Sequence, residues 1–87
     1  MVNMDDLKKA INNSANFLQE IYGEDNIEKI YFEGFKQVEK KHEGYFCITL
    51  SYKERVPQPS VLYSTVWHTK TFKVDNFHFE VLSMEKS

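Results

Sequence analysis

The rest of the chain is organised around residues 65–84, in its last quarter. The residues of this stretch are mostly β-branched or aromatic, which suits the pleated, half-buried surface of a β-strand. Since successive side chains of a strand point to opposite faces, this stretch predicts two antiparallel strands that meet near Asp75. We expect them at about 64–75 and 77–84.

Two turns between these strands are compatible with the pattern. A two-residue turn at 75–76 would bury Phe77 and Phe79. A four-residue loop at 76–79 would leave at least one of those rings at an exposed tip. The two registers differ by an even number of residues, so the side chains keep the same faces in both.

An amphipathic helix is predicted over about 4–22. Asn3 or Asp5 can cap its first turn, and Gly23 stands where a glycine commonly ends a helix. The expected buried stripe consists of Leu7, Ile11, Ser14, Leu18 and Ile21. A helix of this length is marginal alone and must bury the stripe on another element.

Two more strands are expected at about 28–40 and 45–54. Beside Gly34 the alternation of the first is broken, which predicts a bulge or bend there. The apolar face of the second, which we expect to meet the helix, consists of Phe46, Ile48, Leu50 and Tyr52. Residues 1–87 are therefore predicted to form a single α+β domain, with one N-terminal helix packed on a four-stranded antiparallel β-meander.

The tail FKVDNFHFEVLSM and the strand GYFCITLSY resemble a group of small uncharacterised prokaryotic proteins. Tails of that group read roughly Tyr-Lys-x-Phe-x-Val-Asp-x-x-x-Gly-Glu-Val-Leu-Ser-Met-Lys, and its middle strand reads Trp-x-Val-Thr-Leu. The matching positions are Lys70, Phe72, Val74, Asp75, Glu80, Val81, Leu82, Ser83 and Met84, with Phe46, Ile48, Thr49 and Leu50 in the middle strand. The resemblance implies a cystatin-like or PepSY-like fold and no particular function. Phe79 stands where the group has glycine, and a bulky residue resists positive φ, which disfavours the group's long loop here but leaves both turns open.

Charge balance argues against nucleic acid as a partner. The 87 residues carry a net charge of −2, whereas a general nucleic-acid binder usually has a basic stripe. Lysines are spread over several of the expected strands with Tyr31, Tyr45 and Tyr52 among them, and a basic, aromatic sheet face could stack single strands of nucleic acid. The interleaved acids Glu33, Glu39, Glu43 and Glu54 weaken that interpretation.

Cys47 is the only cysteine, so an intrachain disulfide is excluded and a reducing, cytoplasmic location is expected. The sequence shows no cationic neighbour for it, and we expect a small strand residue rather than a reactive thiol. The polar start of the chain and the lack of a long apolar run predict neither a signal peptide nor a membrane span.

Catalytic and metal-binding patterns are missing from the sequence. His42, His68 and His78 have no metal-ligand spacing, and no serine stands in a nucleophile motif. We expect the Asp75 carboxylate to bond backbone N–H groups of its own turn. The chain is thus predicted to be no enzyme and to use no metal or cofactor.

A binding surface is the leading functional hypothesis. By the alternation, Trp67, Leu82 and Met84 share the hairpin face opposite the core, where a lone helix-on-sheet layer should be polar. The loop before the hairpin also carries Val61, Leu62 and Tyr63, and it either covers this face or joins it in binding.

Three function classes follow. The first is a non-enzymatic protein-binding module of the inhibitor, immunity or adaptor type. The second is a small-ligand pocket between helix and sheet, lined by Phe17, Phe32, Phe46 and Phe72. The third is a self-associating subunit, for which a homodimer is the simplest form.

Overall fold

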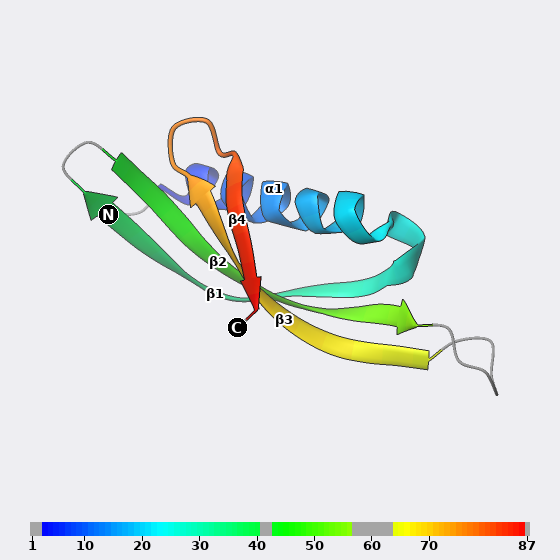
Figure 1. Cartoon of the computed structure of the whole chain (residues 1–87). Coiled ribbons are helices and arrows are strands. Elements are labelled where there is room, and N and C mark those ends of the chain that lie inside the picture. The colour runs from blue at the N-terminus through cyan, green and yellow to red at the C-terminus, as the bar shows by residue number, and fades with distance from the viewer. Residues whose placement is uncertain (1–2, 41–42, 57–63, 87) are drawn as a thin grey trace.

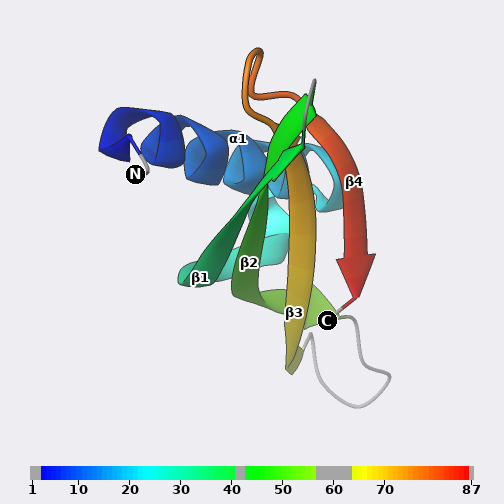
Figure 2. The same cartoon turned by 90° about the vertical axis from the view of Figure 1, so that its left-hand side faces the viewer.

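The computed structural model of the protein describes residues 3–40, 43–56 and 64–86. Its elements are helix α1 (Met4–Tyr22), a 3₁₀ turn η1 (Glu24–Asn26) and strands β1 (Ile27–Lys40), β2 (Glu43–Val56), β3 (Ser64–Asp75) and β4 (Val81–Lys86) (Figure 1). The strands form one antiparallel sheet in the order β1-β2-β3-β4, side by side as Figure 2 shows. The predicted α+β fold, one helix on a four-stranded meander, is confirmed.

Helix α1 begins and ends where its capping residues predict. The Asn3 side-chain oxygen accepts hydrogen bonds from the backbone N–H groups of Asp5 at 2.9 Å and Asp6 at 3.4 Å. At the other end Gly23 has a φ of 89° and donates its N–H to the Gln19 carbonyl at 2.8 Å. Both caps satisfy backbone groups that a helix end leaves unpaired.

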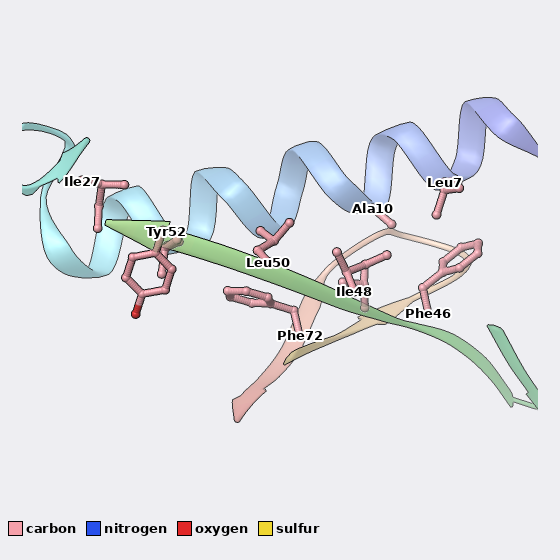
Figure 3. Packing of buried hydrophobic residues seen from close by; sticks show 10 residues of the cluster. Leu7, Ala10, Ile27, Phe46, Ile48, Leu50, Tyr52 and Phe72 are labelled. Carbon is pink, nitrogen blue, oxygen red and sulfur yellow. The ribbon is translucent and has the colours of Figure 1, made fainter. Parts of the chain in front are cut away.

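The core lies between α1 and the face of the sheet that it covers, here called the helix face (Figure 3). Its buried apolar residues are Leu7, Ala10 and Leu18 from α1, Ile27 from β1, Phe46, Ile48, Leu50 and Tyr52 from β2, and Phe72 and Val74 from β3. The predicted inward face of β2 is confirmed. Ile21 was expected in the buried stripe but is 51% exposed, because Tyr22 instead packs on the Tyr52 ring at 6.0 Å.

Strand β1 carries the expected bulge beside Gly34. The register shifts between Phe32 and Gly34, so Phe32 pairs with Leu50 and Phe35 with Ile48. Both phenylalanines therefore lie on the helix face. They are at the sheet edge and half exposed, and their rings stack at a centroid distance of 6.4 Å.

The connection between β3 and β4 is the long one. Val74 pairs with Val81, and the Asp75 N–H donates to the Glu80 carbonyl at 2.9 Å. The predicted strand at 77–84 is wrong at its start, since β4 begins at Val81. Phe79 has a φ of 59°, a conformation that its bulk was expected to disfavour.

Local and tertiary hydrogen bonds stabilise this strained loop. The Asp75 carboxylate accepts from the N–H groups of Phe77 at 3.3 Å and His78 at 2.6 Å, as expected for a turn aspartate. The Asn13 side chain donates to the Phe79 carbonyl at 2.7 Å, and the Phe79 ring packs against the core. A positive φ costs a non-glycine residue roughly 1–2 kcal/mol, which these contacts offset.

A second bulge, in β4, exchanges the faces of its last residues. Phe72 pairs with Met84 and Lys73 with Ser83, while Leu82 is the extra residue before the Val74–Val81 pair. The alternation had placed Met84 beside Trp67 on the side opposite the core. That placement is wrong for Met84, because the unpaired Leu82 turns it to the helix face, where it packs against the core.

Candidate functional site: the open face of the sheet

The sheet face opposite α1, here called the open face, carries the candidate site. Strand register assigns to it Lys29, Tyr31, Lys36 and Val38 from β1, Tyr45, Cys47, Thr49, Ser51, Lys53 and Arg55 from β2, Trp67, Thr69, Thr71, Lys73 and Asp75 from β3, and Ser83 and Glu85 from β4. In the described part of the chain α1 packs on the helix face and no second helix covers the open one. Trp67 lies on this face, as its alternation predicts.

Trp67, Tyr31 and Lys53 form a cluster that we call the Trp67 corner. The Trp67 ring lies 5.6 Å from the Tyr31 ring at an angle of 30°, and the Lys53 ammonium is 5.1 Å from its centroid. Trp67 nevertheless remains 52% exposed. A large ring held by two neighbours can contact a partner without losing much side-chain freedom.

Tyr45 and Lys73 form a second cluster, the Tyr45 corner, near the other end of the sheet. The Lys73 ammonium lies 4.3 Å from the Tyr45 ring centroid, within the range of a cation–π interaction. At a strand rise of about 3.3 Å per residue, the two corners are roughly 20–25 Å apart.

Hydroxyl groups occupy the open face between the corners. Thr49 and Thr71 are hydrogen-bonded across β2 and β3 at 3.2 Å, and Ser51 and Thr69 at 3.0 Å. Between β2 and β3 the middle of the face is therefore polar but uncharged, with both corners outside it and Glu85 beside it at the β4 edge.

Acidic and basic residues that alternate in the sequence are separated in the folded sheet. Lys29, Lys36, Lys53 and Lys73 all lie on the open face. Glu54 lies on the helix face, where it bonds His68 at 3.1 Å, and Glu39 lies there beside Gln37 at 3.2 Å. The expectation that these two glutamates interleave with the lysines is therefore wrong.

The remaining sheet acids are placed as follows. Glu28 and Glu33 fall at the two bulges of β1, and Glu28 bonds Arg55 at 2.9 Å. Glu85 pairs with Thr71 on the open face at the β4 edge. Asp75 pairs with Tyr45 on the same face. The Glu43 side chain is outside the described part, and among the side chains described the lysines outnumber the acids on the open face.

Cys47 lies between two lysines that the sequence did not reveal as neighbours. It pairs with Lys36 on β1 and with Lys73 on β3, and its side chain is half-buried. Cross-strand neighbours depend on register, which is why a search of nearby sequence missed both.

The other predicted site residues do not join Trp67. Leu82 is 55% exposed but lies at the β4 bulge beside the Tyr45 corner end of β3, roughly 20 Å of strand away from Trp67. Met84 faces the core. Val61, Leu62 and Tyr63 lie outside the described residues.

The four phenylalanines proposed to line a ligand pocket take different positions in the fold. Phe46 and Phe72 are buried in the core, and Phe72 meets Phe17 edge-on at 6.3 Å. Phe32 lies half exposed at the β1 edge. Phe17 does line a shallow hollow, together with Asn13, Asn16, Glu20, His78, Phe79, Glu80 and Val81, but this hollow is open to solvent.

Ionisable groups in the described residues serve local structure. The Asp75 carboxylate caps its turn, and His68 pairs with Glu54. Within residues 3–40, 43–56 and 64–86, no three histidine, cysteine, aspartate or glutamate side chains come close enough to hold a metal ion. Among the helices described, none has the length and apolar character needed to cross a membrane.

No protein-family model, curated protein or solved structure matches this chain. The resemblance to the small prokaryotic group stays a prediction.

Proposed function

We propose that this protein is a non-enzymatic module, of the inhibitor, immunity or adaptor type, that binds a protein partner on the open face. The observation that carries the proposal is Trp67, which is half exposed yet held between Tyr31 and Lys53. Tryptophan and tyrosine dominate the energetics of protein interfaces, especially where neighbours keep them rigid.

The surroundings of the Trp67 corner support the same function. The open side of a sheet that packs a helix on its other side is ordinarily polar. Here it carries three aromatic side chains, Tyr31, Tyr45 and Trp67. Hydroxyl groups lie between these aromatic residues and lysines lie beside them, and protein interfaces likewise combine aromatic with polar groups.

The ionisable side chains Asp75 and Glu54 bond groups near them in the structure, which favours a binding role over a catalytic one. Asp75 bonds its own turn, and Glu54 bonds His68. Neither pair places a nucleophile beside a base, which is the arrangement that covalent catalysis needs.

Self-association is a second candidate, favoured by the edge of β1. The stacked rings of Phe32 and Phe35 are half exposed on an edge strand, and an edge strand can pair with a second copy. Light scattering across a range of concentrations tests it, and a monomer at the highest concentration rules it out.

Affinity capture from cells of the organism that encodes the protein tests the lead proposal. Trp67→Ala should lose the captured partner, because it removes the central ring. Ile21→Ala is the matched control, since Ile21 is 51% exposed but lies on α1. Equal capture by wild type and Trp67→Ala would contradict the proposal.

A further inference from the structure

We infer that the segment with which the partner docks on the open face is acidic. The inference rests on the proposed function and concerns the chemistry of the partner at the same site. Lys29, Lys36, Lys53 and Lys73 face the partner. Register places two acids with them, Glu85 and Asp75, and the Asp75 carboxylate bonds backbone N–H groups of its own turn. Opposite charge across an interface speeds association and selects the partner.

The Trp67 corner and the Tyr45 corner can each bind a carboxylate. Lys53 rests over the Trp67 ring at 5.1 Å and Lys73 over the Tyr45 ring at 4.3 Å. A ring fixes each ammonium on one side, so its remaining N–H groups are available to an approaching anion. The stem of a partner glutamate can then pack on the aromatic surface beside its bonded carboxylate.

The spacing of the corners adds a second requirement. An extended chain that reaches across roughly 20–25 Å needs about seven residues. Between the corners it would lie over the hydroxyl pairs Thr49–Thr71 and Ser51–Thr69, which carry no charge. We therefore expect two groups of acids separated by a neutral stretch.

This pattern favours an acidic polypeptide over a nucleic acid. A nucleic-acid strand carries a phosphate at every nucleotide and would place several over the neutral middle of the face.

Intrinsic fluorescence provides a direct test, because Trp67 is the only tryptophan in the chain. The probe is a synthetic peptide with a Glu-Asp-Glu group at each end and about seven serine and threonine residues between them. Its addition should change Trp67 emission saturably, and added salt should weaken the binding.

Lysine variants assign the effect to the open face. The double variant Lys53→Ala/Lys73→Ala should weaken binding about tenfold or more, as expected for two charge-assisted contacts. Lys53→Arg/Lys73→Arg, which keeps both charges, should retain most of the affinity. Lys70→Ala/Lys86→Ala is the matched control, because these two lysines pair with each other on the helix face, and it should bind like wild type. Circular dichroism and the urea midpoint confirm that each variant is folded.

Three results would overturn the inference. The first is that a peptide with glutamine and asparagine in place of the acids binds as tightly as the acidic peptide. The second is that the acidic peptide causes no saturable change in Trp67 emission. The third is that oligothymidylate binds more tightly than the acidic peptide. The affinity capture above separates this failure from that of the proposed function. If Trp67→Ala loses the captured partner but Lys53→Ala/Lys73→Ala keeps it, the open face does bind a protein, and the inference that its docking segment is acidic is wrong.

Discussion

The Asn13 side-chain amide donates a 2.7 Å hydrogen bond to the Phe79 carbonyl, and so ties α1 to the loop that joins β3 and β4. Phe79 is the residue of that loop with a φ of 59°. We predict that Phe79→Gly is more stable than Phe79→Ala by about 1 kcal/mol. Both variants lose the ring, but only alanine keeps the Cβ that disfavours positive φ.

Urea unfolding of the two variants measures this difference. At an ordinary strand or helix position glycine is the less stable of the two, so the opposite order would contradict the assigned backbone conformation. Asn13→Ala serves as a companion variant, and loss of its hydrogen bond should cost about 1 kcal/mol.

Charge substitutions in β4 test its bulge. Met84→Glu should destabilise the protein by about 2–4 kcal/mol, because it places an unpaired carboxylate against the core. Leu82→Glu should change stability by less than about 0.5 kcal/mol, because Leu82 is 55% exposed. Thermal and urea unfolding give both values, and similar effects of the two substitutions would show that the register of β4 is wrong.

Gly44 lies too close to Asn76 to accept a side chain. A Cβ at position 44 would overlap the Asn76 amide, whose Cγ would lie 2.9 Å away. Gly44→Ala should therefore cost about 1–3 kcal/mol through overpacking. In an Asn76→Ala background the same substitution should cost at least about 1 kcal/mol less, and a double-mutant cycle measures that coupling.

Asn76→Ala alone should be well tolerated. In the described residues the Asn76 side-chain oxygen is buried without a hydrogen-bond partner, so its removal gives up little. If the cycle shows no coupling, the close approach of Gly44 to Asn76 is not present in solution.

We predict that the free energy of unfolding falls in alkali because of Tyr52. Burial, then a hydrogen bond to Tyr22, raise the pKa of Tyr52 far above its ordinary value of 10.0. Between the unfolded and folded pKa values the folded state keeps a proton that the unfolded state releases. The contribution of Tyr52 is therefore complete below about pH 10 and falls as the pH rises above it.

Urea midpoints of wild type and Tyr52→Phe, compared from neutral pH upward, measure this effect. The wild type should lose stability more steeply above about pH 10 than the variant, which has no proton to release there. Identical slopes would show that the Tyr52 hydroxyl is not buried in solution.

The limits of α1 and the inward face of β2 could be predicted because their signals are local. Asn3 and Gly23 cap the helix through their own backbone neighbours. The side chains of Phe46 and Ile48 point to one face because a regular strand alternates at every residue.

Features set by bulges could not be predicted. Alternation cannot show that Leu82 is an extra residue, and one extra residue moves Met84 to the opposite face. The loop before β4 depends on Asn13, a helix residue 66 positions from Phe79. Its hydrogen bond is one of the contacts that offset the preference of phenylalanine for negative φ.

Only part of the candidate site could be predicted, because the rest depends on bulges and strand register that alternation does not show. Trp67 follows directly from the alternation of β3. Its neighbours Tyr31 and Lys53 depend on the β1–β2–β3 register, and two irregularities in β1 shift part of that register. Separation of the lysines from Glu39 and Glu54 is likewise a property of the paired strands and not of their order in the chain.

The order of the strands in the sheet is also their order of synthesis. Each strand can close a hairpin with the one just made, so the entropy lost in forming each contact between strands stays small. Helix α1 leaves the ribosome before the strands, with Leu7 and Leu18 uncovered until β2 arrives. The nascent chain is therefore most exposed to misassociation before its second strand is made, and assembly of the sheet ends that vulnerability one hairpin at a time.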